Sequence, residues 1–489
     1  MLVEIRPTSR LRGKSAVDLS AALAPVLDAL IADPAADDLD LSRLRVFVDW
    51  IQYRNGFSAP VELRPVVGSA ALELAVDLRR TAGSDPDGVA TAVAAALHAH
   101  RSGGPRDHIT LEEWGPTRHS RIWRFNTLYW QHLRHWEEAT GHGYESALPG
   151  GRSKARDVAP VRETIAGLFA IWDGLAERRA LPEELYVVEF GVGNGGQART
   201  WLDTFVEMDR AHGRDYHRRL HYLMCDYSPH VLELARAEVA EHRDRVSSFV
   251  LDAIRPLTSL AFLRFKAFFV YISNVYDNLP TDEIATIGQR EHLVQSRAYL
   301  PADAAGAVAH RLGVPLEDLR TLVDKLLRLG PELLAEAVPQ HFPRGTADAV
   351  EFWRDCWQGL RLQERYVPLQ GLDTYEIAPG ISGELLRPLL STGGDMRMHV
   401  SNGAATSFAE TLPLLHPYGS LQCHDIVVTD PHQYRVSFRG PGKYDGSVVN
   451  WVNGPLLAHI GARKGFDVAF APFAPDGGRV VTMTAQVRD

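Results

Sequence analysis

Hydrophobic residues follow two alternating spacings through the middle of the chain. Near-continuous apolar runs, each four to nine residues long, are separated by longer segments in which apolar residues recur every three or four positions. Parallel strands that are buried on both faces have this continuous apolar character. The pattern therefore predicts an α/β domain whose parallel sheet is covered by helices on both faces. The predicted strands are LYVVEF at 185–190, LHYLMCD at 220–226, SSFVLD at 247–252 and FKAFFVYIS at 265–273.

The alternation stops after residue 280. Residues 281–395 have mainly helical spacing, and no strong strand pattern returns before GSLQCHDIVVTD at 419–430. We interpret 281–395 as a helical insertion that caps the substrate site, between two halves of one core at 171–280 and 396–489. The last 25 residues predict two strands joined by a Pro/Gly-rich turn, which form a C-terminal antiparallel hairpin.

Two further segments precede the core. Residues 1–105 predict a small α/β module of two helices and several strands. Residues 106–170 predict a helical lid or linker that is rich in aromatic side chains. These aromatic residues either line a substrate cleft or, more simply, pack the segment onto the next domain. They are Trp123, Phe125, Tyr129, Trp130 and Trp136.

Composition and charge narrow the range of functions. The 489 residues are 45% hydrophobic and 23% charged, and the net charge of −9 argues against a nucleic-acid binder that relies on bulk positive charge. The three cysteines form no C-x-x-C pair, which indicates a reducing compartment. No apolar leader or membrane-length run occurs. We therefore expect a cytoplasmic protein with no membrane partner, and we leave a homodimer open.

The segment VEFGVGNGGQAR at 188–199 fits two cofactor patterns. Gly191, Gly193 and Gly196 spell the G-x-G-x-x-G pattern of dinucleotide sites. Glu189 followed by Gly191, Gly193 and Gly195 spells the pattern of S-adenosylmethionine (SAM) sites. In both cases a glycine loop after a parallel strand lets the backbone approach a ligand at a helix N-terminus.

Carboxylates at the ends of successive strands favour SAM. Glu189 would repel the pyrophosphate of NAD but attract the methionine ammonium and the sulfonium of SAM. Asp226 ends the second strand, where a carboxylate can accept from both ribose hydroxyls of either cofactor. Asp252 in FVLDAI could accept from the adenine amine, or it could cap a helix. We therefore predict SAM as the cofactor, with an NAD(P)-dependent oxidoreductase as the weaker alternative.

These motifs resemble those of class I SAM-dependent methyltransferases, and most closely those of the MidA family, whose mitochondrial members assist assembly of respiratory complex I. The resemblance covers about residues 120–489 and includes the glycine loop, the segments at 141–172 and 451–468, and DYSPHVLELAR at 226–236. It implies that Asn194, Gly195, Tyr227, Ser228 and Ala253 join the cofactor site. It implies a Rossmann-like sheet with a C-terminal antiparallel pair.

The segment SNVYDNLP at 273–280 resembles the family's motif after the fourth strand. It suggests Asn274, Tyr276 and Asp277 for the methyl-accepting side, or else a turn capped by Asp277 before Pro280. The family's motif is approximately Asn-Glu-x-x-Asp-Ala-x-Pro, whereas Val275 follows Asn274 here. Guanidinium recognition requires carboxylates, so this difference puts the family's protein-arginine acceptor in doubt.

A small-molecule acceptor is therefore preferred, although a protein arginine methyltransferase or a SAM-binding assembly factor without turnover stays open. His399 and His424 are candidate bases, but a lone histidine at a strand end is more often structural. No His, Asp or Glu cluster has convincing metal-ligand spacing, so we predict no metal.

Overall fold

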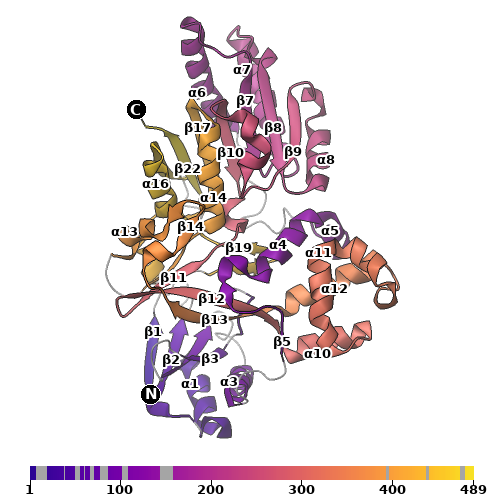
Figure 1. Cartoon of the computed structure of the whole chain (residues 1–489), viewed down its shortest axis with the longest axis vertical. Coiled ribbons are helices and arrows are strands. Elements are labelled where there is room, and N and C mark those ends of the chain that lie inside the picture. The colour runs from indigo at the N-terminus through magenta and orange to yellow at the C-terminus, as the bar shows by residue number, and fades with distance from the viewer. Residues whose placement is uncertain are drawn as a thin grey trace.

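A computed structural model describes residues 1–6, 19–37, 39–49, 56–59, 61–65, 71–77, 86–101, 108–143, 158–391, 396–436, 440–473 and 480–488. The protein is a mixed α/β molecule (Figure 1). Its main sheet occupies the upper half of Figure 1, a second sheet crosses the middle, and the N-terminal segment lies below. The predicted motif segment at 144–157 and the predicted hairpin turn at 474–479 lie outside the described residues.

The main sheet has the strand order β21-β22-β17-β10-β7-β8-β9. Strands β17, β10, β7, β8 and β9 run parallel, β22 pairs antiparallel with β17, and β21 pairs antiparallel with β22. The short β20 (Val452–Asn453) pairs parallel with the end of β17. The bounds are β7 Leu185–Phe190, β8 Leu220–Asp226, β9 Val246–Val250, β10 Ala267–Ser273, β17 Leu415–Val428, β21 Phe466–Pro472 and β22 Val480–Val487.

Both faces of this sheet are covered, which explains the continuous apolar strands. Every residue of β7 is buried. Leu185 and Val187 point into a core formed with α6 (Val158–Glu177), α7 (Gly196–Ala211) and α8 (Pro229–Glu238). Tyr186, Val188 and Phe190 point into the opposite core, formed with α9 (Pro256–Leu260), α14 (Asn402–Thr411) and α16 (Gly454–Arg463). Successive side chains of a strand point to opposite faces, so each face needs its own apolar residues.

The segment 281–395 contains strands that the sequence pattern did not predict. Three of them, β11, β12 and β13, form a second sheet with β16, which follows the segment. The strand order is β13-β12-β11-β16, and β5 and β6 pair with β12. Every second residue of β12 from Val294 to Leu300 is buried, but two of these positions are Ser296 and Ala298. Small residues give a weak hydrophobic alternation, so the strand was missed. The bounds are β5 Ile109–Thr110, β6 Gly115–Pro116, β11 Glu283–Ile287, β12 Arg290–Leu300, β13 Arg361–Pro368 and β16 Met396–His399.

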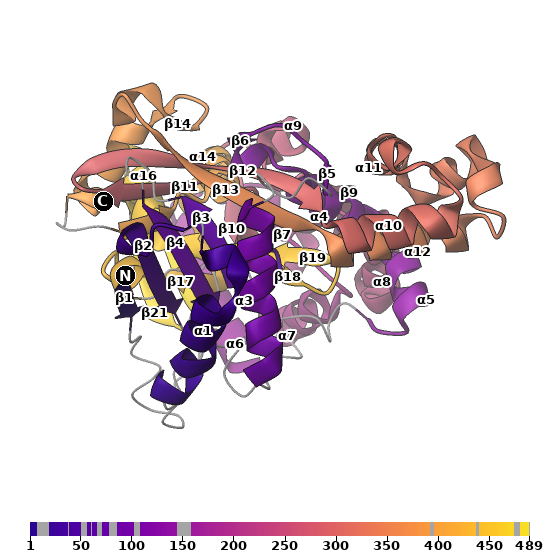
Figure 2. The same ribbon diagram turned by 90° about the horizontal axis from the view of Figure 1, so that it is seen from below.

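The helices of this segment form a layer with the aromatic segment before the core. Helices α10 (Ala302–Leu312), α11 (Leu319–Ala337) and α12 (Thr346–Gly359) lie together beside α4 (Arg121–Gln131) and α5 (Leu133–Thr140), as Figures 1 and 2 show. The sequence predicted one helix where α4 and α5 are separated at His132. Helices α10 to α12 thus share one hydrophobic core with the aromatic helices α4 and α5.

In the N-terminal segment, four strands form a sheet of their own and two helices pack on it. Its sheet has the order β1-β2-β4-β3, and α1 (Leu19–Ala32) and α3 (Pro86–Arg101) pack on it. Figure 2 shows both helices on the face of this sheet that is turned away from the rest of the chain. Strand β1 was not predicted. The strand bounds are β1 Leu2–Arg6, β2 Leu44–Asp49, β3 Val61–Pro65 and β4 Leu72–Asp77.

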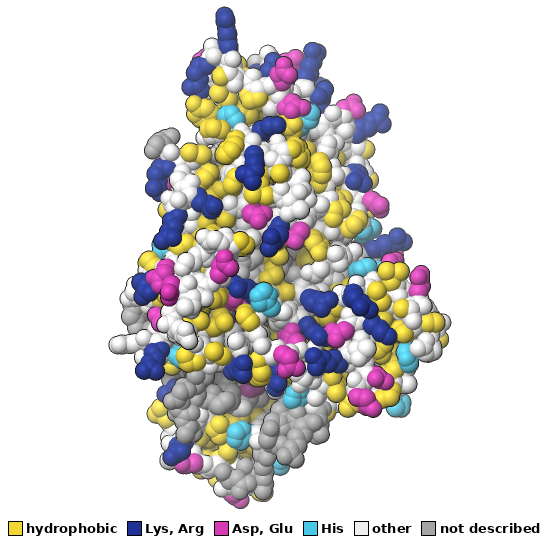
Figure 3. All heavy atoms as spheres, in the orientation of Figure 1, with side chains coloured by type: hydrophobic (Ala, Val, Ile, Leu, Met, Phe, Trp, Pro, Cys, Tyr) yellow, Lys and Arg dark blue, Asp and Glu magenta, His cyan; other side chains and the backbone are white. Residues whose placement is uncertain are grey.

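The remaining elements are short. The strand pair β14–β15 is Glu376–Ala378 with Ile381–Ser382, and the pair β18–β19 is Gly442–Tyr444 with Ser447–Val449. Helices α13 and α15 span Arg387–Leu390 and Gln433–Val436. On the face in Figure 3 acidic and basic side chains are interspersed. Among the described helices, none has both the length and the apolar character that a membrane crossing requires.

Candidate functional site

A pocket lies at the carboxyl ends of the parallel strands, beside the point where the strand order reverses between β7 and β10. Ligands of open α/β sheets bind at such a switch point. The floor comes from the last residues of β7, β8 and β10 and from the residues that follow β7, β8 and β9, and the opposite wall comes from α4 and the loop after β10. The lining residues are Trp123, Asn126, Thr127, Trp130, Glu189, Phe190, Gly191, Val192, Gly193, Asn194, Gln197, Cys225, Asp226, Tyr227, Leu251, Asp252, Ala253, Ile254, Tyr271, Ser273, Asn274, Val275, Asn278, Leu279 and Pro280.

The glycines of the loop have two roles. Two of them border the ligand space, and a third allows two helices to pack closely. Gly191 has a left-handed φ of 71°, and a Cβ there would come within 2.5 Å of Val275 Cγ2. Gly191 and Gly193 line the pocket, so their bare backbones border the ligand space. Gly195, which was predicted to contact the cofactor, is not a lining residue. It caps α7 with a φ of 84°, and a Cβ there would meet Ala235 of α8 at 2.8 Å.

Glu189 is the buried acid of the site. Glu189 lines the pocket, the residue is only 2% exposed, and its Oε2 accepts a hydrogen bond of 2.7 Å from the Tyr222 hydroxyl. Burial raises the pKa of Glu189 to about 8, against the smaller opposing effect of the Tyr222 hydrogen bond. The side chain therefore carries a proton near neutral pH unless a cation binds beside it.

Asp226 links the loop to the next helix. Its Oδ2 accepts from the backbone N–H of Gly193 at 3.2 Å, and its Oδ1 accepts from the N–H of Ser228 at 3.0 Å. Burial raises the pKa of Asp226 to about 6, although these backbone donors lower it. Each carboxylate oxygen keeps a second lone pair, so Asp226 can still accept from two hydroxyls of a ligand.

The other predicted cofactor residues have different positions. Tyr227, Asp252, Ala253 and Asn194 line the pocket. Asp252 lies two residues beyond β9, where its Oδ1 accepts from the Ile254 N–H at 2.9 Å. It therefore stabilises a turn as well as bordering the pocket. Asn194 similarly accepts from the Gly196 N–H at 3.0 Å.

Ser228 is buried and does not line the pocket. Its hydroxyl oxygen accepts from the Val231 N–H at 3.3 Å and caps α8. The side chain thus satisfies a free donor of the first helical turn, and its contact with a cofactor stays a prediction.

The loop after β10 presents only one of the three predicted catalytic residues to the pocket. Asn274 lines the pocket with a left-handed φ of 51°. Tyr276 and Asp277 are buried outside the lining, and their N–H groups both donate to Asp425 Oδ2, at 2.9 and 3.2 Å. Burial raises the pKa of both Asp277 and Asp425, the latter to about 7. Asp425 thus holds the loop from behind.

Some aromatic residues of the segment before the core line the pocket, and others pack into a hydrophobic core. Trp123 and Trp130 line the pocket. Phe125, Tyr129 and Trp136 pack into the hydrophobic core shared with α11 and α12. Helix α4 is fixed over the pocket by Asn126, whose Nδ2 donates to the carbonyl of Asn278 at 2.9 Å.

Several pocket residues were missed by the sequence analysis. Gln197 Oε1 and Asn278 Oδ1 are buried atoms with no hydrogen-bond partner among the described residues. Both residues line the pocket, so they offer acceptors to a ligand. Gln197 directly follows the glycine motif, and this position could have indicated it. Nothing in the sequence indicates that Asn126, 152 positions before Asn278, comes to the same wall.

The two candidate histidine bases do not line the pocket. The ring of His424 is 3.1 Å from the Thr482 hydroxyl, and burial lowers its pKa to about 4. His399 is fully buried and packs edge-to-face with Tyr434. Within the described residues, the ionisable groups of the pocket wall are carboxyls, tyrosines and a cysteine.

Comparisons with known proteins give distant structural likeness only. No family model matches the sequence, and no curated protein matches it. A Burkholderia thailandensis superfamily protein solved with S-adenosyl-homocysteine bound is 13% identical, with a TM-score of 0.41, over 82% of this chain and 94% of that one. The DszA carbon methyltransferase is 11% identical, with a TM-score of 0.34, over 97% and 83% of the two chains. A Burkholderia thailandensis 1,6-didemethyltoxoflavin-N1-methyltransferase is 10% identical, with a TM-score of 0.28, over 68% and 78%. At these values the likenesses assign no activity to this chain.

Proposed function

We propose that this protein is a SAM-dependent methyltransferase that acts on a small, largely apolar acceptor. The observation that carries the proposal is the pair of carboxyls that line a pocket at the switch point of the sheet: the buried Glu189, which precedes the glycine loop, and the half-buried Asp226, which accepts from the loop's Gly193 N–H. The strand order, with an antiparallel strand between two others at one edge, is the arrangement expected of a class I methyltransferase.

The charges of the pocket suit SAM better than NAD. Glu189 is buried beside the loop where a dinucleotide would place its pyrophosphate. A buried carboxyl can only ionise favourably there if the ligand brings a positive charge. The ammonium of the methionine moiety is such a charge. Asp226 would accept from the ribose hydroxyls, and Leu251, Asp252 and Ile254 would border the adenine.

The residues of this chain would act mainly by positioning. SAM supplies an activated methyl group, and its transfer is an in-line displacement by the acceptor's nucleophilic atom. The wall formed by α4 and the loop after β10 would hold the acceptor against the floor and exclude water. Asn274 and Asn278 could orient a polar atom of the acceptor. No histidine in the described part of the pocket is available as a base, so the proton of a hydroxyl or ammonium acceptor would pass to a carboxyl or to water.

The acceptor side of the pocket favours an uncharged molecule. Its wall consists of indole rings, amides and aliphatic side chains, including Trp123, Trp130 and Val275. Val275 occupies the position at which the resemblance leads one to expect a glutamate, and Asp277 is buried away from the pocket. A guanidinium would require acidic partners on this side, so a protein arginine is the weaker acceptor candidate.

Calorimetric titration with S-adenosylhomocysteine tests the cofactor. We expect saturable binding that Gly193→Arg abolishes, because the new side chain fills the space beside the loop. Gly167→Arg is the matched control, since Gly167 is exposed on α6 and a Cβ there meets nothing within 4 Å. NADH binding in place of S-adenosylhomocysteine binding would replace the proposal with the oxidoreductase alternative.

Turnover separates an enzyme from a binding factor. The purified chain is incubated with SAM and a panel of aromatic hydroxyl, amine and carbon acceptors, and with arginine-containing peptides. We expect S-adenosylhomocysteine to accumulate with at least one small acceptor and to depend on Trp130. Accumulation with peptides alone would overturn the acceptor class, and cofactor binding without turnover on any acceptor would favour an assembly factor.

A further inference from the structure

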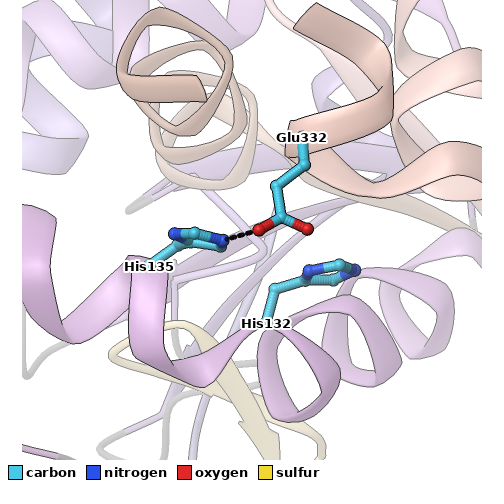
Figure 4. A group of neighbouring side chains, drawn as sticks. All are labelled: His132, His135 and Glu332. Atoms are coloured by element: carbon cyan, nitrogen blue, oxygen red, sulfur yellow. Dashed lines mark hydrogen bonds and ion pairs between the residues drawn. The ribbon is translucent and has the colours of Figure 1, made fainter. Parts of the chain in front are cut away.

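A group of three potential metal ligands lies outside the proposed active site. His132 and His135 stand at the junction of α4 and α5, and Glu332 comes from α11 (Figure 4). One ligand atom from each residue lies within 4.8 Å of the others. Figure 4 shows the Glu332 carboxylate directed between the two rings, with His135 Nε2 at 2.7 Å from Oε1. The sequence predicted no metal because Glu332 lies 197 positions after His135.

The backbone of α11 is shaped to present Glu332. The helix is interrupted at Gly330, which has a left-handed φ of 76° and is followed by Pro331. A Cβ at Gly330 would come within 2.5 Å of His132 Nε2, so the His132 ring lies directly against this glycine. The interruption therefore both makes room for His132 and begins a new helical turn that carries Glu332.

The two histidine rings have different surroundings. Glu138 Oε2 lies 3.8 Å from His135 Nδ1, behind the ring, while Nε2 points at Glu332. A carboxylate behind a ligating histidine is the usual outer partner in metal sites. The His132 ring makes no hydrogen bond within the described residues, so a ring nitrogen stays available to an ion.

We propose that His132, His135 and Glu332 bind one divalent transition-metal ion of the zinc type. Two imidazole nitrogens and one carboxylate oxygen make a ligand set that Zn²⁺ accepts, with water completing a tetrahedral shell. Small side-chain rotations would have to bring the three ligand atoms to the spacing of a tetrahedral shell. An ordinary ion pair between His135 and Glu332 accounts for only two of the three residues, since it gives no role to the second ring.

Because this site lies next to the pocket wall, a bound ion would affect how that wall is held. His132 directly follows α4, whose Thr127 and Trp130 line the pocket, and Gln131 Nε2 donates to the Tyr227 hydroxyl at 3.1 Å. An ion held by α4, α5 and α11 would tie the wall of the pocket to the helical layer. This inference does not depend on the proposed activity, since the ion would bind whatever the pocket accepts.

Metal titration of the full chain, without a histidine tag and after treatment with a chelator, tests the site. Co²⁺ is followed by its visible absorption and Zn²⁺ by calorimetry. We expect one ion per chain, an upward shift of the melting temperature with Zn²⁺, and at least about a tenfold loss of affinity in each of His135→Ala and Glu332→Gln. His310→Ala is the matched control, because His310 is exposed on α10 and away from the group, and it should leave the affinity unchanged.

Two results would overturn the site. The first is the absence of saturable one-to-one binding by a chain whose circular dichroism is that of a folded protein. The second is unchanged affinity in Glu332→Gln, a substitution of an exposed residue by one of the same shape that should not disturb folding. In either case the group is an ion pair beside a packed histidine.

Discussion

At the scale of single residues, Glu189 links stability to ligand binding. Burial raises its pKa from 4.5 to about 8, so the folded chain holds the proton more tightly than the unfolded chain. The stability that this adds is present below pH 4.5 and is lost as the pH rises through about 8. We expect Glu189→Gln, which still accepts from Tyr222, to raise the free energy of unfolding of ligand-free protein by about 2–4 kcal/mol above that pH, but little in acid. Denaturant titrations at both pH values measure this.

The same substitution should remove cofactor binding. The affinity of the unmodified chain for S-adenosylhomocysteine should increase with pH up to about 8, because the carboxylate must form to meet the ammonium. Glu189→Gln should lose at least about 100-fold in affinity and most of this pH dependence. Glu184→Gln is the control, since Glu184 also accepts from a tyrosine hydroxyl, that of Tyr186, but its side chain is 54% exposed. Retained affinity in Glu189→Gln would mean that the loop binds another ligand.

Asp226 and Asp252 provide a second comparison between residues. Asp226→Asn would remove one of the two acceptors that hold the Gly193 and Ser228 N–H groups, and its amide would place a donor against another donor. We expect Asp226→Asn to weaken S-adenosylhomocysteine binding by about 10- to 100-fold in calorimetry. Asp252→Asn should cost less than about tenfold, because Asp252 is exposed and an amide oxygen can still accept from Ile254. Equal losses would contradict the assignment of the ribose to Asp226.

At the scale of elements, Gly195 sets the distance between α7 and α8. A Cβ would lie 2.8 Å from the Ala235 Cα and 3.0 Å from its carbonyl oxygen, and neither backbone atom can move aside cheaply. We therefore expect Gly195→Ala to destabilise the fold by about 1–3 kcal/mol, including the strain of its left-handed φ. Gly167→Ala on α6 should be neutral or stabilising by up to about 1 kcal/mol. Thermal unfolding compares the two, and an unchanged melting temperature in Gly195→Ala would show that α8 can shift.

Strands that are buried on both faces could be predicted from the sequence, because their residues form a continuous apolar run. The predicted strand 185–190 coincides with β7, because both of its faces are apolar. Strand β12 could not be predicted, because its buried face includes Ser296 and Ala298 and owes its conformation to pairing with β11 and β13. The break at His132 has no glycine or proline signal in the sequence, and the His132 ring lies against Gly330 of a distant helix.

In the site, too, the local sequence predicts some positions, while contacts with distant segments decide others. Residues at strand ends, such as Glu189 and Asp226, could be predicted, since the carboxyl ends of parallel strands meet at one edge. The direction of each side chain in the loop after β10 could not. Asn274 faces the pocket while Tyr276 and Asp277 turn inward, because Asp425 on β17 binds their N–H groups from behind.

At the scale of the whole molecule, Phe57 anchors the N-terminal segment to the helical layer. It is fully buried and packs edge-to-face on Trp357 of α12, with ring centroids 5.6 Å apart. Its carbonyl accepts from the Leu362 N–H at 2.8 Å, and Lys443 Nζ lies 5.2 Å from its ring centroid. This contact ties the N-terminal segment to α12 and β13, so the segment should share the stability of that layer.

Phe57→Ala tests this coupling. Loss of a fully buried phenylalanine should cost about 3–5 kcal/mol, because it leaves a cavity against Trp357. We expect a lower melting temperature and faster proteolysis of the first hundred residues. The affinity for S-adenosylhomocysteine should change by less than about threefold, since Phe57 does not line the pocket. Phe265→Ala, at a residue that is 63% exposed, should leave all three measurements unchanged. If Phe57→Ala abolished cofactor binding while the chain stayed folded, the N-terminal segment would have to be coupled to the pocket through α12 and α4, and it would then be part of the site's support.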